Sequence, residues 1–362
     1  MPLEVVSTRE LPTVNVTHGC CTDGSSLFFC TWDSPAKIFK VEPETLEVKS
    51  FTLGTTLDMG NDIVYHNGYL WVVLYRRNLT IVRVDTDLSE WKLAVYSNPR
   101  DYFFPMSLAL DAENDTIYCG AVYGGIFAID VSDPDNVSRR RYDCPTDYNH
   151  ALAFMDGALY GWGFRNFNWS NPKKPAFWKF DGSSFTSVDL EVSLTDDFCV
   201  HNGYVYGVSE AWRGQTQPPK VCKVDSSLNI EYLSLDEKKI GYYIDGIIEY
   251  KGRLFASCRS KIYPIVEIAP DFSEVLYLAK TSTLPVTYPD EGVVLGDYLF
   301  LQSAEEGWRY GPYIGQNYVH KLRWTSYAPT PSPVSVTFGA KDERGDIHGV
   351  KLYVDGKLIG EI

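Results

Sequence analysis

The chain has 362 residues, of which 44% are hydrophobic and 22% charged, and its formal net charge is −14. The apolar content is sufficient for a buried core and excludes a chain that is disordered by composition. The negative charge excludes an extended nucleic-acid surface, which needs clustered Lys and Arg, because the only basic run is Arg139-Arg140-Arg141.

The first predicted element is a single strand over residues 3–11, which stands outside the repeat that follows. The segment Met1-Pro2-Leu3-Glu4 lacks the basic start and apolar run of a signal peptide. No run of about 18 apolar residues occurs anywhere, so we expect no insertion into a membrane. The acidic charge also argues against binding to an anionic membrane surface.

The main signal is an internal repeat. The segment Asp62–Trp71 carries His66-Asn67-Gly68 and returns at a constant shift as Asp197–Tyr206, which carries His201-Asn202-Gly203. Each copy is an apolar strand, a tight turn and an aromatic-rich strand, and Gly, Asn and Asp supply the positive φ that hairpin turns require. Weaker copies follow the same pattern at residues 19–28, 107–118, 151–160, 246–255 and 291–300.

A third and a fourth strand follow each hairpin, for example Thr80–Asp85 and Glu90–Tyr96. Four antiparallel strands that repeat about every 40 residues are typical of propeller blades. The seventh unit ends at Trp324 with three strands, so the strand at residues 3–11 is expected to supply its fourth. The predicted units begin near Thr17, Asp62, Met106, His150, Asp197, Gly246 and Glu291.

The pattern resembles the seven-bladed β-propeller superfamily over residues 1–327. The chain lacks Trp-Asp repeat signatures, kelch double glycines and the Ser-x-Asp-x-Gly boxes of sialidases, so the resemblance implies an architecture and no particular activity. The fold class is therefore all-β, with a propeller closed by the N-terminal strand.

After the propeller, residues 328–333 form a stiff Pro-rich linker. Residues 334–362 contain the stretch Tyr353-Val-Asp-Gly-Lys-Leu-Ile-Gly360, which resembles the core hairpin of immunoglobulin-like or PEGA-type β-sandwiches. About thirty residues are too few for a sandwich, which usually needs about 100. We therefore expect the start of a β-domain that further domains of a longer chain, or neighbouring subunits, complete.

Three long loops, at residues 163–176, 209–219 and 303–317, lie between second and third strands and carry many aromatic residues. Long loops on a rigid scaffold concentrate function, and aromatic side chains stack on sugars or anchor protein partners. The alternative is that these side chains only cover the ends of the blades. The candidate ligand-binding residues are Phe164, Phe167, Trp169, Trp212, Trp308, Tyr310 and Tyr313.

Polar residues recur at the entry to the predicted innermost strands, at His18, Asp62, Ser107, His150, Asp197, Asp245 and Glu291. Rings of oxygen atoms can hold Ca²⁺ or Mg²⁺, and the alternative is a hydrated polar channel. We expect no organic cofactor. The candidate metal ligands, for Ca²⁺ first, are Asp62, Asp197, Asp245 and Glu291.

Eight cysteines show no zinc-site spacing, so they are either buried apolar side chains or, among Cys20, Cys21 and Cys30, a disulfide across one hairpin. Asn-x-Ser/Thr sequons favour an exported or virion-borne glycoprotein. The candidate glycosylation sites are Asn15, Asn78, Asn114, Asn136 and Asn168.

These features predict a binding or adhesion module on an extracellular, cell or virion surface, with a protein or glycan receptor at the long-loop face, as in host attachment. No nucleophile elbow, zinc-protease motif or phosphate loop occurs. One alternative is a propeller lyase or hydrolase with an axial site built from Asp62, His150, Asp197 and Asp245. Another is an architectural coat or filament protein.

Overall fold

The computed structural model describes residues 3–13, 17–54, 59–76, 78–97, 104–123, 125–167, 174–209, 219–241, 244–304, 316–325, 335–338, 350–354 and 357–361. The chain forms two compact units, Val5–Arg323 and a second unit of Met1–Glu4 with Trp324–Ile362. In the described part of the chain the only helix is the four-residue α1, Glu237–Ile240, and no helix there could cross a bilayer.

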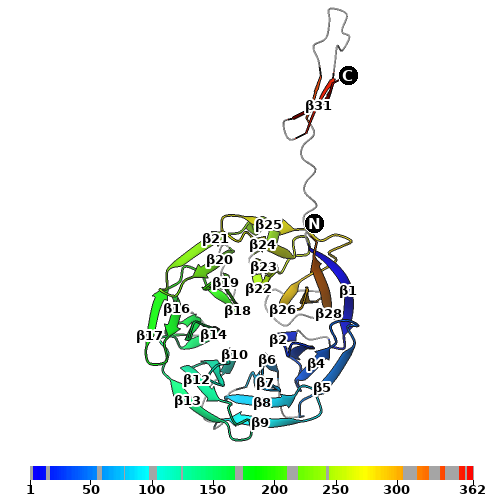
Figure 1. Cartoon of the computed structure of the whole chain (residues 1–362). Helices are drawn as coiled ribbons and strands as arrows, with labels where there is room; N and C mark the ends of the chain where they lie inside the picture. The colour runs from blue at the N-terminus through cyan, green and yellow to red at the C-terminus, as the bar shows by residue number, and fades with distance from the viewer. Residues whose placement is uncertain are drawn as a thin grey trace, which may run out of the picture. The chain divides into compact units, whose positions relative to one another are not determined.

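The unit Val5–Arg323 is a ring of four-stranded antiparallel sets around a central opening (Figure 1). The first four sets run in chain order from the innermost strand outward. They are β2 Thr17–Thr22, β3 Leu27–Thr31, β4 Lys37–Val41 and β5 Val48–Thr52; β6 Gly60–His66, β7 Tyr69–Leu74, β8 Thr80–Asp85 and β9 Trp91–Tyr96; β10 Phe104–Asp111, β11 Thr116–Val122, β12 Gly125–Asp130 and β13 Ser138–Tyr142; β14 Tyr148–Met155, β15 Ala158–Phe164, β16 Pro175–Phe180 and β17 Phe185–Asp189.

The third and fourth sets join through the single pair Val122↔Tyr148. Two further sets follow the same order, and the seventh, described next, is completed by the N-terminal strand. The strands of these three sets are β18 Leu194–His201, β19 Tyr204–Ser209, β20 Lys220–Val224 and β21 Ile230–Ser234; β22 Ile244–Tyr250, β23 Arg253–Cys258, β24 Ile265–Ile268 and β25 Val275–Leu278; β26 Pro289–Leu295, β27 Tyr298–Ala304, β28 Asn317–Trp324 and β1 Leu3–Leu11.

The N-terminal strand closes the ring, as the missing fourth strand predicted. In the seventh set the strand order is β1-β28-β27-β26, so β1 lies outermost and joins the two ends of the repeat in one sheet. Closure removes an exposed strand edge, which is otherwise a site for unwanted pairing. The predicted β-propeller closed by its N-terminal strand is therefore confirmed.

The core lies between neighbouring sets. Successive side chains of a strand point to opposite faces of its sheet, and both faces of each set are covered. Phe28 of β3 packs with Leu70 and Val72 of the second set, whereas its neighbour Phe29 packs with Phe300 of the seventh. Coverage on both faces explains why the second strands are continuous apolar runs rather than alternating ones.

In the C-terminal unit, three short strands form one antiparallel sheet. Val336 pairs with Leu352, and Leu352 pairs in turn with Gly360. That this sheet begins a β-sandwich stays a prediction. Its strands are β29 Ser335–Phe338, β30 Val350–Val354 and β31 Lys357–Glu361.

Close backbone approach makes Gly163 of β15 a sensitive position. A Cβ atom at Gly163 would lie 1.6 Å from the backbone oxygen of Tyr148. We expect Gly163→Ala to lower the free energy of unfolding by about 3 kcal/mol, measured by denaturant titration, because overpacked cores shift backbone. Gly182→Ala is the control: no atom lies within 4 Å, and only its φ of +91° opposes a side chain, so we expect a cost of about 1 kcal/mol. Equal costs would contradict the argument.

Candidate functional site

Each of the seven innermost strands carries a register shift near its start. A β-bulge there places an extra residue in the inner strand, which re-aims neighbouring side chains. The strands begin two or three residues before most of the predicted unit starts, because a short pair precedes each bulge. The shifts lie at His18/Cys20, Gly60/Asp62, Pro105/Ser107, Asn149/Ala151, Leu194/Phe198, Ile244/Gly246 and Pro289/Gly292.

A cavity of about 190 Å³ lies among the innermost strands. Three carboxylates line it, Asp62 from β6, Asp197 from β18 and Glu291 from β26, together with Cys20 of β2. No Lys or Arg of the described residues is part of this lining. The described lining of the cavity, called the axial cavity below, is therefore acidic.

Two of the three carboxylates also connect neighbouring sets. Asp62 Oδ2 accepts a hydrogen bond of 2.7 Å from the backbone N–H of Leu108, and Asp197 Oδ2 accepts one of 3.0 Å from that of Ile247. Asp62 and Asp197 occupy equivalent repeat positions, and each bonds to the innermost strand of the next set. Their first role is structural, and it fixes their side chains at the cavity wall.

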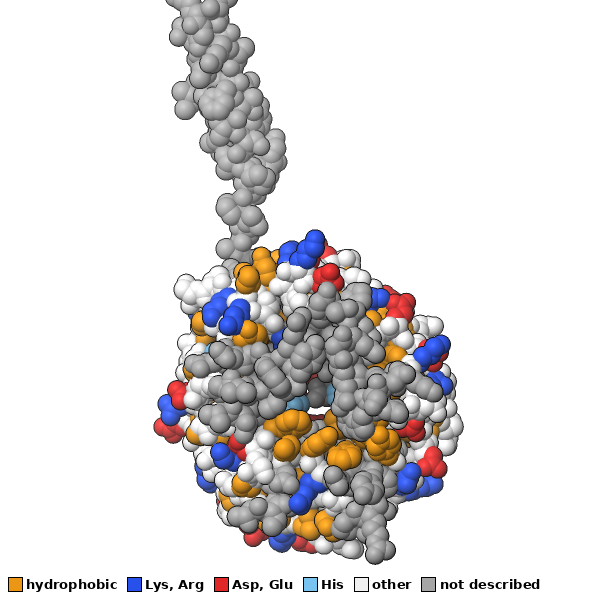
Figure 2. Space-filling model, turned by 180° about the vertical axis from the view of Figure 1, so that it is seen from behind, with side chains coloured by type: hydrophobic (Ala, Val, Ile, Leu, Met, Phe, Trp, Pro, Cys, Tyr) orange, Lys and Arg blue, Asp and Glu red, His pale blue; other side chains and the backbone are white. Residues whose placement is uncertain are grey.

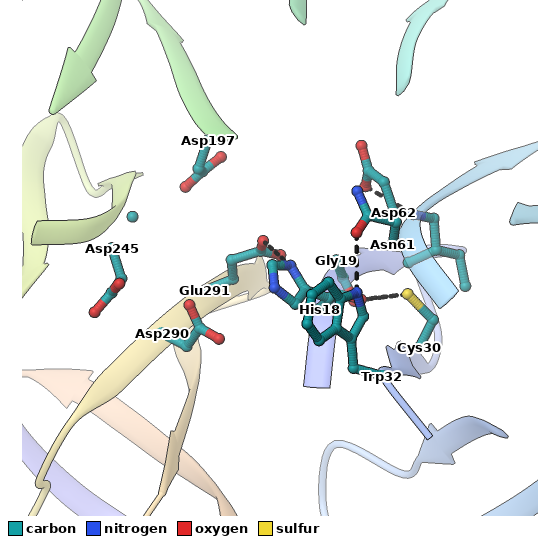
Figure 3. A network of polar contacts seen from close by, with 12 residues as sticks. His18, Gly19, Cys30, Trp32, Asn61, Asp62, Asp197, Asp245, Asp290 and Glu291 are labelled. Carbon is teal, nitrogen blue, oxygen red and sulfur yellow. Dashed lines mark hydrogen bonds and ion pairs between the residues drawn. The ribbon is translucent and has the colours of Figure 1, made fainter. Parts of the chain in front are cut away.

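A polar network surrounds the third carboxylate (Figure 3). His18 Nδ1 lies 4.0 Å from Glu291 Oε1. The indole N–H of Trp32 donates a 3.0 Å hydrogen bond to Asn61 Oδ1, and the Asn61 amide donates to the backbone oxygen of Met106. Asn61 is only 4% exposed, so it ties the first three sets together beneath the cavity entrance.

Three of the four predicted metal ligands line the cavity, and Asp245 does not. Arg259 Nε donates a 2.6 Å hydrogen bond to Asp245 Oδ1, which neutralises that carboxylate within its own set. Among the described residues no three His, Cys, Asp or Glu side chains form a group that could hold a metal ion. Calcium binding stays a prediction that this geometry does not strengthen.

The axial enzyme site predicted as an alternative is likewise only partly assembled. Asp62 and Asp197 line the cavity, whereas His150 does not. His150 is 6% exposed, and its ring packs 5.1 Å from that of Tyr148 and 5.4 Å from that of Trp162. Acid–base catalysis needs titratable groups that reach one substrate, and His150 and Asp245 do not share the cavity with the other two.

The cavity carboxylates act on the thiol of Cys20. Burial raises its pKa well above the ordinary value, and the charges of Glu291, Asp197 and Asp62 raise it further. A negative potential disfavours a thiolate just as it favours a cation. The three cavity carboxylates therefore make the surroundings of Cys20 electrostatically negative.

Aromatic rings follow the rim of the opening, at the ends where innermost strands begin and second strands finish; this end is called the mouth face. Tyr75 lies 5.7 Å from Trp32 and 5.4 Å from Phe104 between ring centroids. Farther round, Phe167 lies 6.0 Å from Tyr123. Figure 2 shows hydrophobic side chains gathered beside the central opening, with histidine inside it. The mouth aromatics are Trp32, Tyr75, Phe104, Tyr123 and Phe167.

Of the predicted loop aromatics, the structure describes Phe164 and Phe167. They are 2% and 7% exposed and pack with Tyr148, so Phe167 supports the rim from below and Phe164 belongs to the core. For these two residues the structure fits the alternative that the aromatic side chains only cover the ends of the blades. The other five, Trp169, Trp212, Trp308, Tyr310 and Tyr313, lie outside the described residues.

Trp32, Tyr75 and Tyr123 were not predicted as functional residues from the sequence. Each directly follows a second strand, β3, β7 or β11, so aligning the repeats at the ends of these strands would have revealed a recurring aromatic position. This aromatic position was not predicted because the loops that follow Trp32 and Tyr75 are short, and function was expected in long loops.

The cysteines and sequons are placed as follows. All eight cysteines are free thiols, so no disulfide crosses the first hairpin.

Asn114 and Asn136 are exposed, whereas Asn78 is 7% exposed and its amide donates to the backbone oxygen of Ser97. A glycan on Asn78 would have to displace that packing. Asn15 and Asn168 lie outside the described residues.

No protein-family model and no curated protein matches the chain. Solved structures do match: the WD40 repeats of RRP9 at 12% identity and TM-score 0.65, covering 88% of this chain and 99% of that one. YCF48 bound to the D1 peptide matches at 11% and 0.59, covering 90% and 97%. A luciferin-regenerating enzyme matches at 14% and 0.52, covering 90% and 95%.

At these identities the likeness shows the fold alone, and the chain is a β-propeller protein. One of these structures is a peptide complex and another is an enzyme, so the fold does not choose between binding and catalysis. That choice depends on the mouth face and the axial cavity.

The electrostatic account of the cavity predicts the reactivity of Cys20. Glu291→Gln removes the largest charge acting on this thiol, so its pKa should fall and its alkylation by iodoacetamide at pH 8.5 should become several-fold faster, because the thiolate is the nucleophile. Peptide mass spectrometry gives the rate for each cysteine. Cys144 is the internal control, since Glu291 does not contribute to its raised pKa. An unchanged alkylation rate of Cys20 in this variant would contradict the conclusion that the cavity is electrostatically negative.

Proposed function

We propose that the chain is a protein-binding module whose partner lies across the mouth aromatics and inserts one Lys or Arg side chain into the axial cavity. The observation that carries this proposal is the combination of an aromatic rim with a cavity whose described lining carries three carboxylates. An ammonium or guanidinium group is attracted both to carboxylates and to aromatic faces.

The size of the cavity favours a side chain over a whole ligand. Pockets that enclose drug-sized molecules measure roughly 300–1,000 Å³, whereas this cavity measures about 190 Å³. A single long side chain fits this space, and the rest of its peptide would then contact the rim. A glycan, which lacks a positive charge, would use the rim without the carboxylates.

Backbone strain at the rim also supports a binding role. Tyr123 is 42% exposed and has a φ of 61°, a left-handed conformation that is rare for a bulky residue. Its N–H donates a 2.6 Å hydrogen bond to the backbone oxygen of Asp147, which holds the strained conformation. Such strain costs about 1–3 kcal/mol and clusters at functional sites.

The fold comparison supports a protein partner by analogy, since YCF48 is a propeller found with a bound peptide. An enzyme is the weaker candidate, because the cavity does not assemble the predicted acid–base residues. An extracellular or virion-surface location, and a role in adhesion, stay predictions.

A random-peptide display library tests the proposal directly. We expect selected peptides to contain Lys or Arg beside apolar residues. Calorimetry on the best peptide should show about 10-fold weaker binding or more for Glu291→Gln, because charge-assisted hydrogen bonds contribute about 1.5–3 kcal/mol. Tyr75→Ala should also weaken it.

The matched control is Tyr96→Ala, which removes a 51% exposed ring on the outer strand β9 and should leave binding unchanged. Peptides without basic residues, or equal affinity for wild type and Glu291→Gln, would contradict the proposal. A specific glycan-array hit that is insensitive to Glu291→Gln would instead favour a carbohydrate receptor.

A further inference from the structure

One imidazole links the three outer strands of the seventh set, in addition to the pairing of β1 in its sheet. His320 of β28 shares a 2.8 Å hydrogen bond between its Nδ1 and Thr8 Oγ1 of the closing strand β1. Its Nε2 shares a 2.6 Å hydrogen bond with Ser303 Oγ of β27. Three strands of the seventh set are therefore connected through the two nitrogen atoms of a single side chain.

The groups that contact this imidazole are uncharged, and Glu10, two residues beyond Thr8 on the same face of β1, is exposed to solvent. Thr8 faces it from β1, Ser303 from β27, and the ring of Tyr318 stacks on it at 6.2 Å within β28. In the described ranges no carboxylate pairs with His320, and the ion pair of the next residue, Lys321 with Glu44, belongs to the opposite face of β28. His320 is only 4% exposed, so a charge on its ring would have neither water nor a counter-ion.

The closing strand is the least buried strand around this group. Only Leu3 and Leu11, at its two ends, are fully buried, and the residues near Thr8 are exposed. Two further polar contacts of the closing segment come from amide side chains, which do not titrate: Gln316 donates to the backbone oxygen of Leu11, and Asn317 donates to that of Thr13. Segments with few buried apolar contacts open locally at lower cost than the whole fold.

We propose that His320 is an acid-sensitive latch, and that protonation of its imidazole releases β1 from the seventh set while the other sets stay folded. A protonated ring would still donate to both hydroxyl groups, since each can turn to accept. What the closed form cannot supply is solvation of the charge. Separation of β1 lets water reach the ring.

The direction of the pH effect follows from linkage. Burial lowers the pKa of His320 from an ordinary value of 6.5 to about 4. The open form therefore binds the proton more tightly than the closed form. The latch is at full strength above about pH 6.5 and is lost as the pH falls through 4, so the open fraction should rise about 20-fold between pH 7 and pH 5.

Hydrogen exchange of the whole chain, corrected for intrinsic rates, tests this latch. Peptides that cover β1 should lose protection about 20-fold between pH 7 and pH 5, whereas peptides from β6 to β9 should not. His320→Gln keeps a neutral group that can hydrogen-bond but does not titrate, so it should remove the pH response. His201→Gln, a change at a histidine bonded to its neighbour Asn202, should retain it.

Two exchange results would overturn the proposal: β1 protection that does not change with pH, or an equal change in every set, which would mean global unfolding. A direct NMR titration of the wild-type His320 ring avoids dependence on a variant that fails to fold. A midpoint near pH 4 supports the latch, and a midpoint at or above about pH 6 refutes it, because the closed ring would then tolerate the charge.

Discussion

The structure depends on one constraint: each four-stranded set is apolar on both faces and can be buried only between two others. Phe28 and Phe29, adjacent in β3, pack against different neighbours and are both fully buried. A linear stack of such sets would always leave two faces in water, and a ring leaves none. Closure is therefore a condition for burying the core, and it places the start and the end of the repeat in one sheet.

The same geometry creates the candidate site. A ring brings its innermost strands together at the axis, and the bulge at the start of each strand turns polar side chains there. The repeat then divides these groups by role. Asp62 and Asp197 accept hydrogen bonds from backbone N–H groups of the next set, whereas Glu291, at the equivalent position, lies 4.0 Å from the His18 side chain of the next set. The proposed binding chemistry lies where the seven copies differ.

This division explains what could be predicted from the sequence. The strands follow from local periodicity, and the closing role of residues 3–11 follows from the missing fourth strand of the last repeat. Both signals can be read from the sequence alone. The cavity lining depends on side-chain direction after a bulge and on partners in other strands. Asp245 stands one position earlier in its repeat than Glu291, at the position of Asp290, and Arg259 binds it within its own set, outside the cavity lining. Phe164 and Phe167 belong to a long loop and its flanking strand, yet β15 and Tyr148 bury them.

The closing strand and the mouth aromatics are also connected through a few intervening residues. Ser303, the inner partner of His320, is followed by Ala304, which packs with Trp32 of the mouth aromatics. On the other side, Thr13 beyond the closing strand donates a 2.9 Å hydrogen bond to Asp33, the residue after Trp32. The first contact reaches the side chain of Trp32, and the second reaches the residue that follows it. If β1 is released as proposed, we expect the packing around Trp32 to change with it, because closely packed groups leave little room to absorb a displacement.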